Sequence, residues 1–334
     1  MKVKEKVLIK EDHRFEKKLC KYSVSFLMPK KELVKQREKH GDIYLDFPIG
    51  ESDILPDYED NASEIAKIIN LLTEIRDDEN SEIIEIGLDC YSSPNNSYVL
   101  NGEITTKRAY GLKRYIQFLY GFDSNIFKIR GMSDDWERLE QLLLGLDIAG
   151  KEELLSVIWN TESFDEREKD FKQIRNGEFC QYMEENIYPL LRRFRYSIIY
   201  TIHPFDTEKG KCVLKRHPEQ LSQDELYQIA RTYKSYTPKF NEIITLAVKL
   251  SPNDEIANLN AAALALKLKN ISLAEEYLKK SKINTPEFLN NMGILHMLCR
   301  EYNKAWDAFK QAVEKGSNDG ELNLVMLEKE KIYK

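Results

Sequence analysis

Apolar residues follow two different periods along this chain, and each period predicts its own kind of element. Ile84, Ile86 and Leu88 alternate with polar neighbours, which predicts a half-buried strand. The polar stretch from Ser92 to Asn96 comes next and carries the Pro and Asn residues that mark a loop. From Thr105 onward the period becomes helical, with one apolar face made of Ala109, Leu112, Ile116 and Leu119.

Similar patterns on either side extend this region into an α/β arrangement. Residues 43–69 predict a strand, a loop with prolines and a helix, residues 126–131 predict a third strand, and residues 191–202 a closing strand. Between the last two, residues 133–190 carry helical stripes such as Leu139, Leu142, Leu143 and Leu146. We expect these stripes to form the core of a helical insertion.

The region after Leu221 lacks strand patterns and repeats itself. One set of three helix positions recurs as Phe240, Ile244 and Ala247, as Ala274, Leu278 and Ser281, and as Ala305, Phe309 and Ala312. Repeated helix pairs bury their apolar faces only by stacking, so this pattern predicts an all-α repeat domain. We expect four small residues at close contacts between helices, namely Ala274, Gly293, Ala305 and Ala312.

Together these patterns predict the α+β fold class. An α/β domain at residues 41–204, with its helical insertion at 133–190, is followed by helical repeats at 221–334. We expect residues 1–40 to be the remnant of an N-terminal β-rich region or an extension, because Lys17 to Pro29 has a strand-like pattern.

Composition and charge exclude several function classes. The chain has 334 residues, of which 32% are charged, and its net charge of −6 argues against a nucleic-acid-binding surface. No apolar run is long enough to cross a bilayer, so we expect no transmembrane segment. The first residues, MKVKEKVLIKEDHRFEKKL, lack the apolar core of a signal peptide, and we expect no signal peptide in this chain.

An enzyme finds little support in the motifs. The sequence has no P-loop, G-x-G-x-x-G, H-E-x-x-H or G-x-S-x-G pattern, and adjacent acidic pairs such as Glu184 and Glu185 diverge on a helix. The five cysteines are widely separated and odd in number, which predicts neither a disulfide framework nor a zinc site. We therefore expect no catalytic residue, cofactor or metal, and a buried reduced thiol at each cysteine.

Arg108 is the residue that most suggests a ligand. If the helix begins near Thr105, Arg108 lies in its first turn, where the helix dipole prefers anions. An Arg at that place adds its charge to the free backbone N–H groups, and together they would hold an anion. The alternative is a solvated surface Arg.

Asn101, Ile104, Thr105, Arg108 and Ala109 form the pattern N-x-x-[LI]-[ST]-x-x-R-A. This pattern resembles the signature helix of OmpA-like, peptidoglycan-associated domains. The surrounding segments are similar to that family's opening strand and first helix, its third strand and its closing Arg-Arg strand. The resemblance implies that a loop Asp and the Arg before the Ala grip the diaminopimelate side chain of the peptidoglycan stem peptide.

The sequence departs from the family pattern in the loop. Arg108 matches the family's Arg, but the Asp position falls on Ser93. A neutral hydrogen bond contributes about 0.5–1.5 kcal/mol and a charged one about 1.5–3 kcal/mol, so we expect weak binding of the stem peptide. In the alternation of the strand, Asp89 falls on the same polar face as Glu85 and Gly87. We therefore expect it to be a solvated strand residue rather than a substitute for the missing loop Asp. The implied ligand-binding set is Arg108, Ser93, Asn101 and Thr105.

The C-terminal region resembles a tetratricopeptide (TPR) array, most clearly in its last unit, NMGILHMLCREYNKAWDAFKQAVEKG. With the DDW sequence at Asp134 to Trp136, the order of elements resembles envelope proteins of gut-dwelling Gram-negative bacteria that join an OmpA-like domain to TPRs. The resemblance implies a non-enzymatic protein of the periplasm or outer membrane.

Two functions follow from the resemblance. The first is a scaffold whose repeats bind a protein partner, such as a component of fimbria-like surface structures, beside a degenerate peptidoglycan-type site. The alternative is a true peptidoglycan-binding anchor that uses Arg108.

Overall fold

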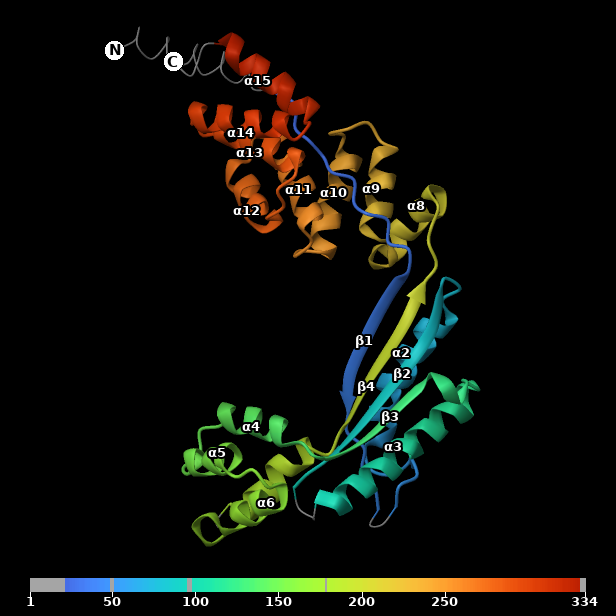
Figure 1. Cartoon of the computed structure of the whole chain (residues 1–334). Coiled ribbons are helices and arrows are strands. Elements are labelled where there is room, and N and C mark those ends of the chain that lie inside the picture. The colour runs from blue at the N-terminus through green and yellow to red at the C-terminus, as the bar shows by residue number, and fades with distance from the viewer. Residues whose placement is uncertain (1–21, 49–50, 95–97, 178, 331–334) are drawn as a thin grey trace, which may run out of the picture. The chain divides into compact units, whose positions relative to one another are not determined.

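The computed structural model describes residues 22–48, 51–94, 98–177 and 179–330, and the chain forms two compact units. The first, which we call the α/β unit, comprises residues 34–203 (Figure 1). The second, the helical unit, comprises the described residues 22–33 and 204–330. The chain therefore has the mixed α+β composition that the sequence predicts.

The α/β unit interleaves strands and helices before a run of inserted helices and a last strand. Its elements are β1 (Lys35–Ile43), α2 (Asn61–Asp77), β2 (Ser81–Ser92), α3 (Tyr98–Tyr120), β3 (Phe127–Asp134), α4 (Trp136–Gly145), α5 (Lys151–Asn160), α6 (Phe164–Gln173), α7 (Cys180–Tyr182) and β4 (Phe194–Ile202). A π-helical turn at Met183–Ile187 continues α7.

The four strands form one sheet in the order β1-β4-β2-β3. β4 is antiparallel to both of its neighbours, whereas β2 and β3 are parallel. The predicted pairing of the closing strand is confirmed, because Ile198 lies opposite Ile86. A strand that returns after the insertion thus completes the centre of the sheet.

Helices α2 and α3 cover one face of this sheet (Figure 1). In α2, the buried residues Ile65, Ile68, Leu72 and Ile75 follow the spacing of one helical face. In α3, Ala109, Leu112 and Ile116 are buried as predicted, but Leu119 is 43% exposed. The apolar face of α3 therefore ends one turn earlier than its sequence pattern predicts.

The first strand lies earlier than predicted. Residues 43–47 were expected as the opening strand, but β1 covers Lys35–Ile43, and the α/β unit begins at Val34. β1 pairs only with β4, so it is an edge strand, and the charged residues of KQREKHGDI suit an exposed edge. Such a strand lacks the apolar alternation by which strands are recognised.

The alternation in β2 is interrupted by an irregularity. The pairing of β2 with β4 shifts register between Ile83 and Glu85, and Ile84 is 44% exposed. Ile86 and Leu88 remain buried in the core, as predicted. An extra residue in one strand reverses the face on which the following side chains lie. This explains why Ile84 is exposed although Ile86 and Leu88 are buried.

The inserted helices between β3 and β4 have a core of their own. It contains the predicted leucines Leu139, Leu143, Leu154 and Leu155, together with Trp136, Phe171 and Met183. α4, α5 and α6 gather beyond the end of the sheet where β3 ends and β4 begins (Figure 1). The insertion is therefore a small helical subdomain attached to that end of the sheet.

The helical unit consists of short helices in succession. They are α8 (Thr207–Arg216), α9 (Gln223–Arg231), α10 (Pro238–Leu250), α11 (Glu255–Lys267), α12 (Ile271–Ser281), α13 (Pro286–Leu298), α14 (Tyr302–Glu314) and α15 (Asn318–Glu330). None of the helices in the described residues is long and apolar enough to cross a membrane.

Small residues lie where the sequence predicts close contacts between these helices. Ala274, Ala305 and Ala312 are fully buried. A Cβ atom at Gly293 of α13 would collide with the ring of Phe309 in α14. The absence of a side chain at Gly293 therefore lets the two helices approach each other.

The N-terminal segment differs from its prediction. Residues 22–33 form no strand and belong to the helical unit, where Tyr22 and Val24 are buried in its core. Side-chain amides of the helices bond their backbone, which replaces the strand partner that the pattern implied. The strand-like pattern of Lys17 to Pro29 thus forms no strand over its described part, and within residues 1–40 the strand that is described begins at Lys35. Residues 1–21 lie outside the described residues.

The buried position of Ala305 leads to a stability prediction. Ala305→Leu adds three carbon atoms to a packed interface and should destabilise the helical unit by about 1–3 kcal/mol. The exposed position Asn303, on the same helix, provides the matched control Asn303→Leu, which should change stability by less than about 0.5 kcal/mol. Urea denaturation of the three proteins tests this, and equal midpoints would contradict the packing described for α14.

Candidate functional site

Polar side chains meet at the end of the sheet where β2 and β3 end and β4 begins. We call this group the Ser93 corner. It comprises Ser93, Asn101, Thr105, Arg108, Asp134 and Arg192. All four site residues predicted from the sequence belong to it, whereas Asp134 and Arg192 do not appear in the predicted set.

Ser93 and Asn101 form the buried part of the corner. Both side chains are almost fully buried, and the Asn101 amide donates to the Ser93 carbonyl oxygen at 3.0 Å and to Asp134 Oδ1 at 2.6 Å. Asn101 thus ties the loop after β2 to the end of β3. Its position is structural, since its donors are already used within the protein.

Thr105 also serves the structure. Its hydroxyl is fully buried and donates to the Asn101 carbonyl oxygen, 2.9 Å away and one turn earlier in α3. A Thr that bonds backward within its own helix keeps its hydroxyl away from solvent. Thr105 therefore supports the helix beside the corner rather than offering a group to a ligand.

Arg108 lies in the middle of α3, because this helix begins at Tyr98 and not near Thr105. The predicted cooperation between Arg108 and free N–H groups of a first turn is therefore wrong. Instead, the Arg108 guanidinium carbon lies 4.2 Å from the centre of the Phe47 ring, a cation–π arrangement. Its Nε is buried and has no hydrogen-bond partner within the described part of the chain.

The surroundings of Arg108 make its charge costly. Burial lowers the pKa of Arg108, and repulsion by the neighbouring Arg192 lowers it further. An Arg pKa starts so high that the group stays charged at neutral pH. An anion beside it would relieve both effects, which makes Arg108 the member of the corner that is best suited to hold one.

Arg192 is the main residue that sequence reasoning missed. Its Nε donates to the Ser93 hydroxyl oxygen at 2.9 Å. The position where the family resemblance implies an Asp is therefore in contact with a cation of the protein itself. The signal was present in the sequence as the Arg-Arg pair before the closing strand, but only a structure brings that pair to Ser93.

Asp134 adds a carboxyl group with an unusual acidity. Its pKa is raised from 3.8 to about 6, chiefly by burial and also by the charge of the nearby Glu168, while the hydrogen bond from Asn101 opposes the shift. The carboxyl is thus harder to ionise than an ordinary Asp. At neutral pH it still carries most of its negative charge.

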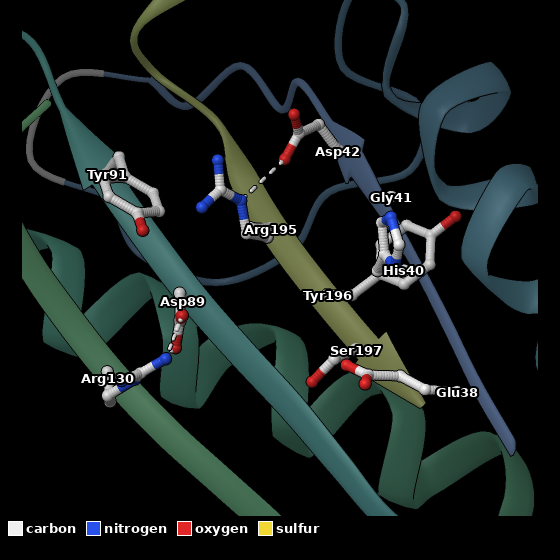
Figure 2. Close-up of a pocket in the computed structure, with 10 residues that line it drawn as sticks. All are labelled: Glu38, His40, Gly41, Asp42, Asp89, Tyr91, Arg130, Arg195, Tyr196 and Ser197. Carbon is white, nitrogen blue, oxygen red and sulfur yellow. Dashed lines mark hydrogen bonds and ion pairs between the residues drawn. The ribbon is translucent and has the colours of Figure 1, made fainter. Parts of the chain in front are cut away.

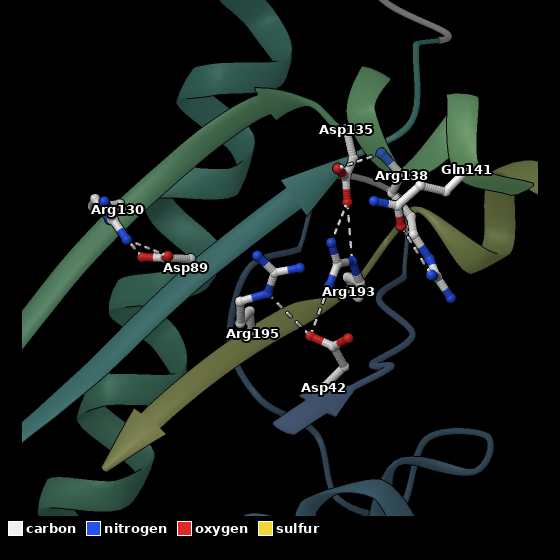
Figure 3. Close-up of polar contacts among 8 residues, drawn as sticks. All are labelled: Asp42, Asp89, Arg130, Asp135, Arg138, Gln141, Arg193 and Arg195. Atoms are coloured by element: carbon white, nitrogen blue, oxygen red, sulfur yellow. Dashed lines mark hydrogen bonds and ion pairs between the residues drawn. The ribbon is translucent and has the colours of Figure 1, made fainter. Parts of the chain in front are cut away.

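A buried ion network lies beside the corner (Figure 3). Arg193, 2% exposed, donates to Asp135 from Nε at 2.9 Å and from a terminal nitrogen at 2.7 Å, and to Asp42 at 2.7 Å. Burial opposes the charge of Arg193, but the bonds and attraction of the two carboxylates outweigh it, so its pKa is raised. Asp135 also accepts from the Arg138 backbone N–H and caps α4.

The sheet face opposite α2 and α3 carries charges in a row across its four strands. Asp42 of β1 lies opposite Arg195 of β4, which lies opposite Asp89 of β2, which lies opposite Arg130 of β3. Arg130 Nε donates to Asp89 at 2.7 Å, and Arg195 Nε lies 3.6 Å from Asp42 (Figures 2 and 3). Opposite charges alternate along the row, so their effects largely cancel.

Asp89 differs in part from its prediction. It lies on the polar face as expected, but it is 8% exposed and paired with Arg130 rather than solvated. Its neighbours Arg130 and Tyr91 shield it from water (Figure 2). Because it lies on the face opposite α3, it does not replace the missing loop Asp beside Arg108.

A hollow of about 540 Å³ opens on this same face, and its lining includes His40, Ser197 and the charged row. His40 and Ser197 are cross-strand neighbours. However, the Ser197 hydroxyl lies where a Cβ of Gly87 would be, and no hydrogen bond to His40 occurs within the described residues. This pair therefore lacks the contact that a nucleophile and its base require.

The cysteines are partly as predicted. Cys90 is buried, and burial raises the pKa of its thiol to about 12, so it stays a neutral core group. Cys180 is half-buried, and Cys212 and Cys299 are exposed, so the expectation of buried thiols is wrong for these three. Cys180 and Cys212 lie in α7 and α8, and Cys299 follows the last residue of α13. Cys20 lies outside the described residues.

No group of three or more His, Cys, Asp or Glu side chains within the described residues could hold a metal ion. The sequence matches no known protein-family model. A search of curated proteins also finds no match. The geometry of the site and the chemistry of its residues therefore carry the functional inference.

The Arg193 network leads to a second stability prediction. Arg193→Met leaves the buried carboxylate of Asp135 without its cation, and should cost about 3–5 kcal/mol. Arg195→Met removes an Arg that is 51% exposed and should cost less than about 1 kcal/mol. Denaturant unfolding of both variants measures the difference. Equal losses would show that burial does not set the strength of the network.

The raised pKa of Asp134 predicts a pH dependence. Because the folded carboxyl holds its proton to a higher pH than the unfolded one, stability should fall as pH rises from about 4 to about 6 and then level off. Asp134→Asn should remove this part of the fall. The difference in unfolding free energy between variant and wild type, measured across this range, tests it, and a constant difference would contradict the raised pKa.

Proposed function

We propose that this chain is a non-enzymatic cell-envelope protein of the periplasm or outer membrane. In this proposal the α/β unit is an OmpA-like domain with a degenerate peptidoglycan-type site, and the helical unit is a TPR-like scaffold that binds a protein partner. Support comes from the signature residues on α3 and from the order of strand, helix, strand, helix, strand, inserted helices and closing strand.

One observation carries the proposal for the site, namely the hydrogen bond from Arg192 to Ser93. In the family that the chain resembles, an Asp at this position would neutralise the ammonium group of diaminopimelate. Here the position is neutral and already contacts a guanidinium, with the charge of Arg108 close by. Two like charges repel an incoming ammonium, so binding of the stem peptide should be weak.

The same charges favour a different chemistry. Arg108 keeps a buried Nε that has no partner among the described residues, and its guanidinium lies over the Phe47 ring. A carboxylate could bind there through charged hydrogen bonds. The corner is therefore better suited to a simple carboxylate than to a zwitterionic side chain. In the second candidate function, a peptidoglycan-binding anchor, Arg108 would hold the carboxylate of diaminopimelate, and a group outside the corner would have to hold its ammonium.

The structure changes how the loop residue should be tested. Ser93→Asp alone places a carboxylate next to Arg192, and the two would pair within the protein. Ser93→Asp combined with Arg192→Gln leaves the new carboxylate available to an ammonium. This double variant should bind diaminopimelate-containing peptidoglycan fragments about tenfold more tightly than the native chain, because a charged hydrogen bond replaces a neutral one.

Isothermal titration calorimetry of the native chain, Ser93→Asp and the double variant measures this difference. Adding Arg108→Ala to the double variant is the control, and it should abolish the gain. Tight binding by the native chain that survives Arg108→Ala would overturn the proposed corner. Tight binding that Arg108→Ala removes would favour the anchor over the scaffold.

A further inference from the structure

Residues 22–27 of the helical unit run as an extended segment across three of its helices. At every second residue, one Asn side chain holds both the N–H and the C=O of the segment. Asn323 of α15 bonds Ser23 at 2.9 and 2.8 Å, and Asn291 of α13 bonds Ser25 at 2.9 and 2.8 Å. Asn260 of α11 bonds Leu27, with both distances at 2.8 Å. We call these three residues the Asn clamp.

The Asn clamp lies far from its occupant in sequence. The bonded residues are 233 to 300 positions apart, and Asn260, Asn291 and Asn323 are 4%, 0% and 0% exposed. A buried side-chain amide is costly unless its hydrogen bonds are satisfied. The three helices thus carry buried amide groups whose hydrogen bonds are satisfied by the extended segment. The spacing of these amides matches every second residue of an extended backbone.

The side chains of the segment follow the same two-residue period. Tyr22 stacks on Phe309 at 6.1 Å, Val24 is buried, and Phe26 meets Phe240 edge-on at 5.5 Å. We call the surface of the helices that holds this segment the groove. It accommodates apolar side chains at alternate positions of the segment. An aromatic residue fits at each end of the series and an aliphatic residue fits between them.

The intervening positions carry hydroxyls that the groove also recognises. The Ser23 hydroxyl donates to one oxygen of Asp319, and the Ser25 hydroxyl donates to the other, both at 2.7 Å. The Ser25 oxygen also accepts from Asn290 at 2.9 Å. The Asp319 carboxylate thus favours a small hydroxyl residue at both positions. A larger side chain at either position would not fit beside it.

We propose that this groove is the docking site of the helical unit for an extended segment of a partner protein, and that Tyr22–Leu27 is a tethered occupant which that segment displaces. The partner segment alternates aromatic or aliphatic residues with Ser or Thr. The inference deepens the scaffold function proposed above and rests on it. The chemistry of the partner follows from the chemistry of the occupant observed in the groove.

Two features make the occupant exchangeable. The Asn clamp contacts backbone groups, which every residue except Pro offers, so a second segment with the same alternation can make the same bonds. Next to the segment, Met28 and Leu33 are 45% and 78% exposed, so although Pro29 between them is buried, these two side chains do not hold the segment in place. A tethered occupant has a high effective concentration, so it also sets the affinity that a partner must exceed.

The test uses the full chain and a fluorescein-labelled peptide of residues 22–29, YSVSFLMP. Tyr22→Ala combined with Phe26→Ala weakens the tethered occupant but leaves the groove intact. Fluorescence anisotropy should show that this variant binds the peptide about tenfold or more tightly than the wild-type chain, in which the tether competes. A peptide N-methylated at Ser25, which lacks the donor to Asn291, should not bind.

A matched pair of Asn substitutions examines the clamp itself. In the Tyr22→Ala/Phe26→Ala background, Asn291→Ala should weaken peptide binding about tenfold or more, since two hydrogen bonds are lost. Asn303→Ala, at an exposed position of α14, should leave it unchanged. If the folded background variant does not bind the peptide, the segment is a fixed part of the core and the proposal is overturned.

A second measurement applies if the background variant fails to fold. Hydrogen exchange of the wild-type chain should then show that the Ser23, Ser25 and Leu27 amides exchange by local opening, faster than the amides of α13. Exchange only through global unfolding would overturn the proposal.

A concentration-dependent dimer of the wild-type chain would also overturn it, because the occupant would then be a second copy. These binding outcomes do not depend on the envelope location, which fractionation of cells tests separately.

Discussion

The α/β unit depends on one buried guanidinium, that of Arg193. Asp42 of β1 and Asp135 at the end of β3 both bond it, although these strands lie at the two edges of the sheet. Asp135 also begins α4, the first inserted helix. The position of the insertion against the sheet, and of the loops around Ser93, therefore follows from where this single charge is neutralised.

The free-energy cost of burying the Arg193 charge explains why the strands around it adopt one register. A guanidinium with 2% exposure is tolerated only if carboxylates meet its donors at the right angles. Alternative registers of β1 or β4 would separate Arg193 from Asp42 and leave a buried charge without its partner. The network thus selects one register for strands whose outer faces are mostly polar.

Local patterns and the return of the closing strand could be predicted from the sequence, whereas long-range contacts between individual side chains could not. The core faces of α2, α3 and the inserted helices follow from spacing alone, because burial imposes the helical period on apolar residues. β1 was misplaced because an exposed edge strand needs charges rather than alternation. The start of α3 was misplaced because its first turns lack an apolar stripe, and this error changed the argument for Arg108.

The candidate site shows the same division. Asn101, Thr105 and Arg108 are predicted by a short motif on one helix and Ser93 by the loop position that the family resemblance implies, and the structure brings the four into one corner. Arg192 is close to Ser93 only because β4 returns to the centre of the sheet, and no local pattern shows that these two side chains meet. The Asn clamp was invisible for the same reason, since Asn260, Asn291 and Asn323 resemble ordinary polar positions of their helices.

The distance of 300 residues between Ser23 and Asn323 has a consequence for the order of events during synthesis. Ser23 leaves the ribosome 300 residues before Asn323 does. The extended segment therefore cannot complete its bonds until Asn323 has been synthesised, although the residues of the sheet and of most helices are available earlier. Throughout that interval the newborn chain carries an undocked segment and an incomplete Asn clamp, so the segment is exposed to other partners before its own binding surface exists.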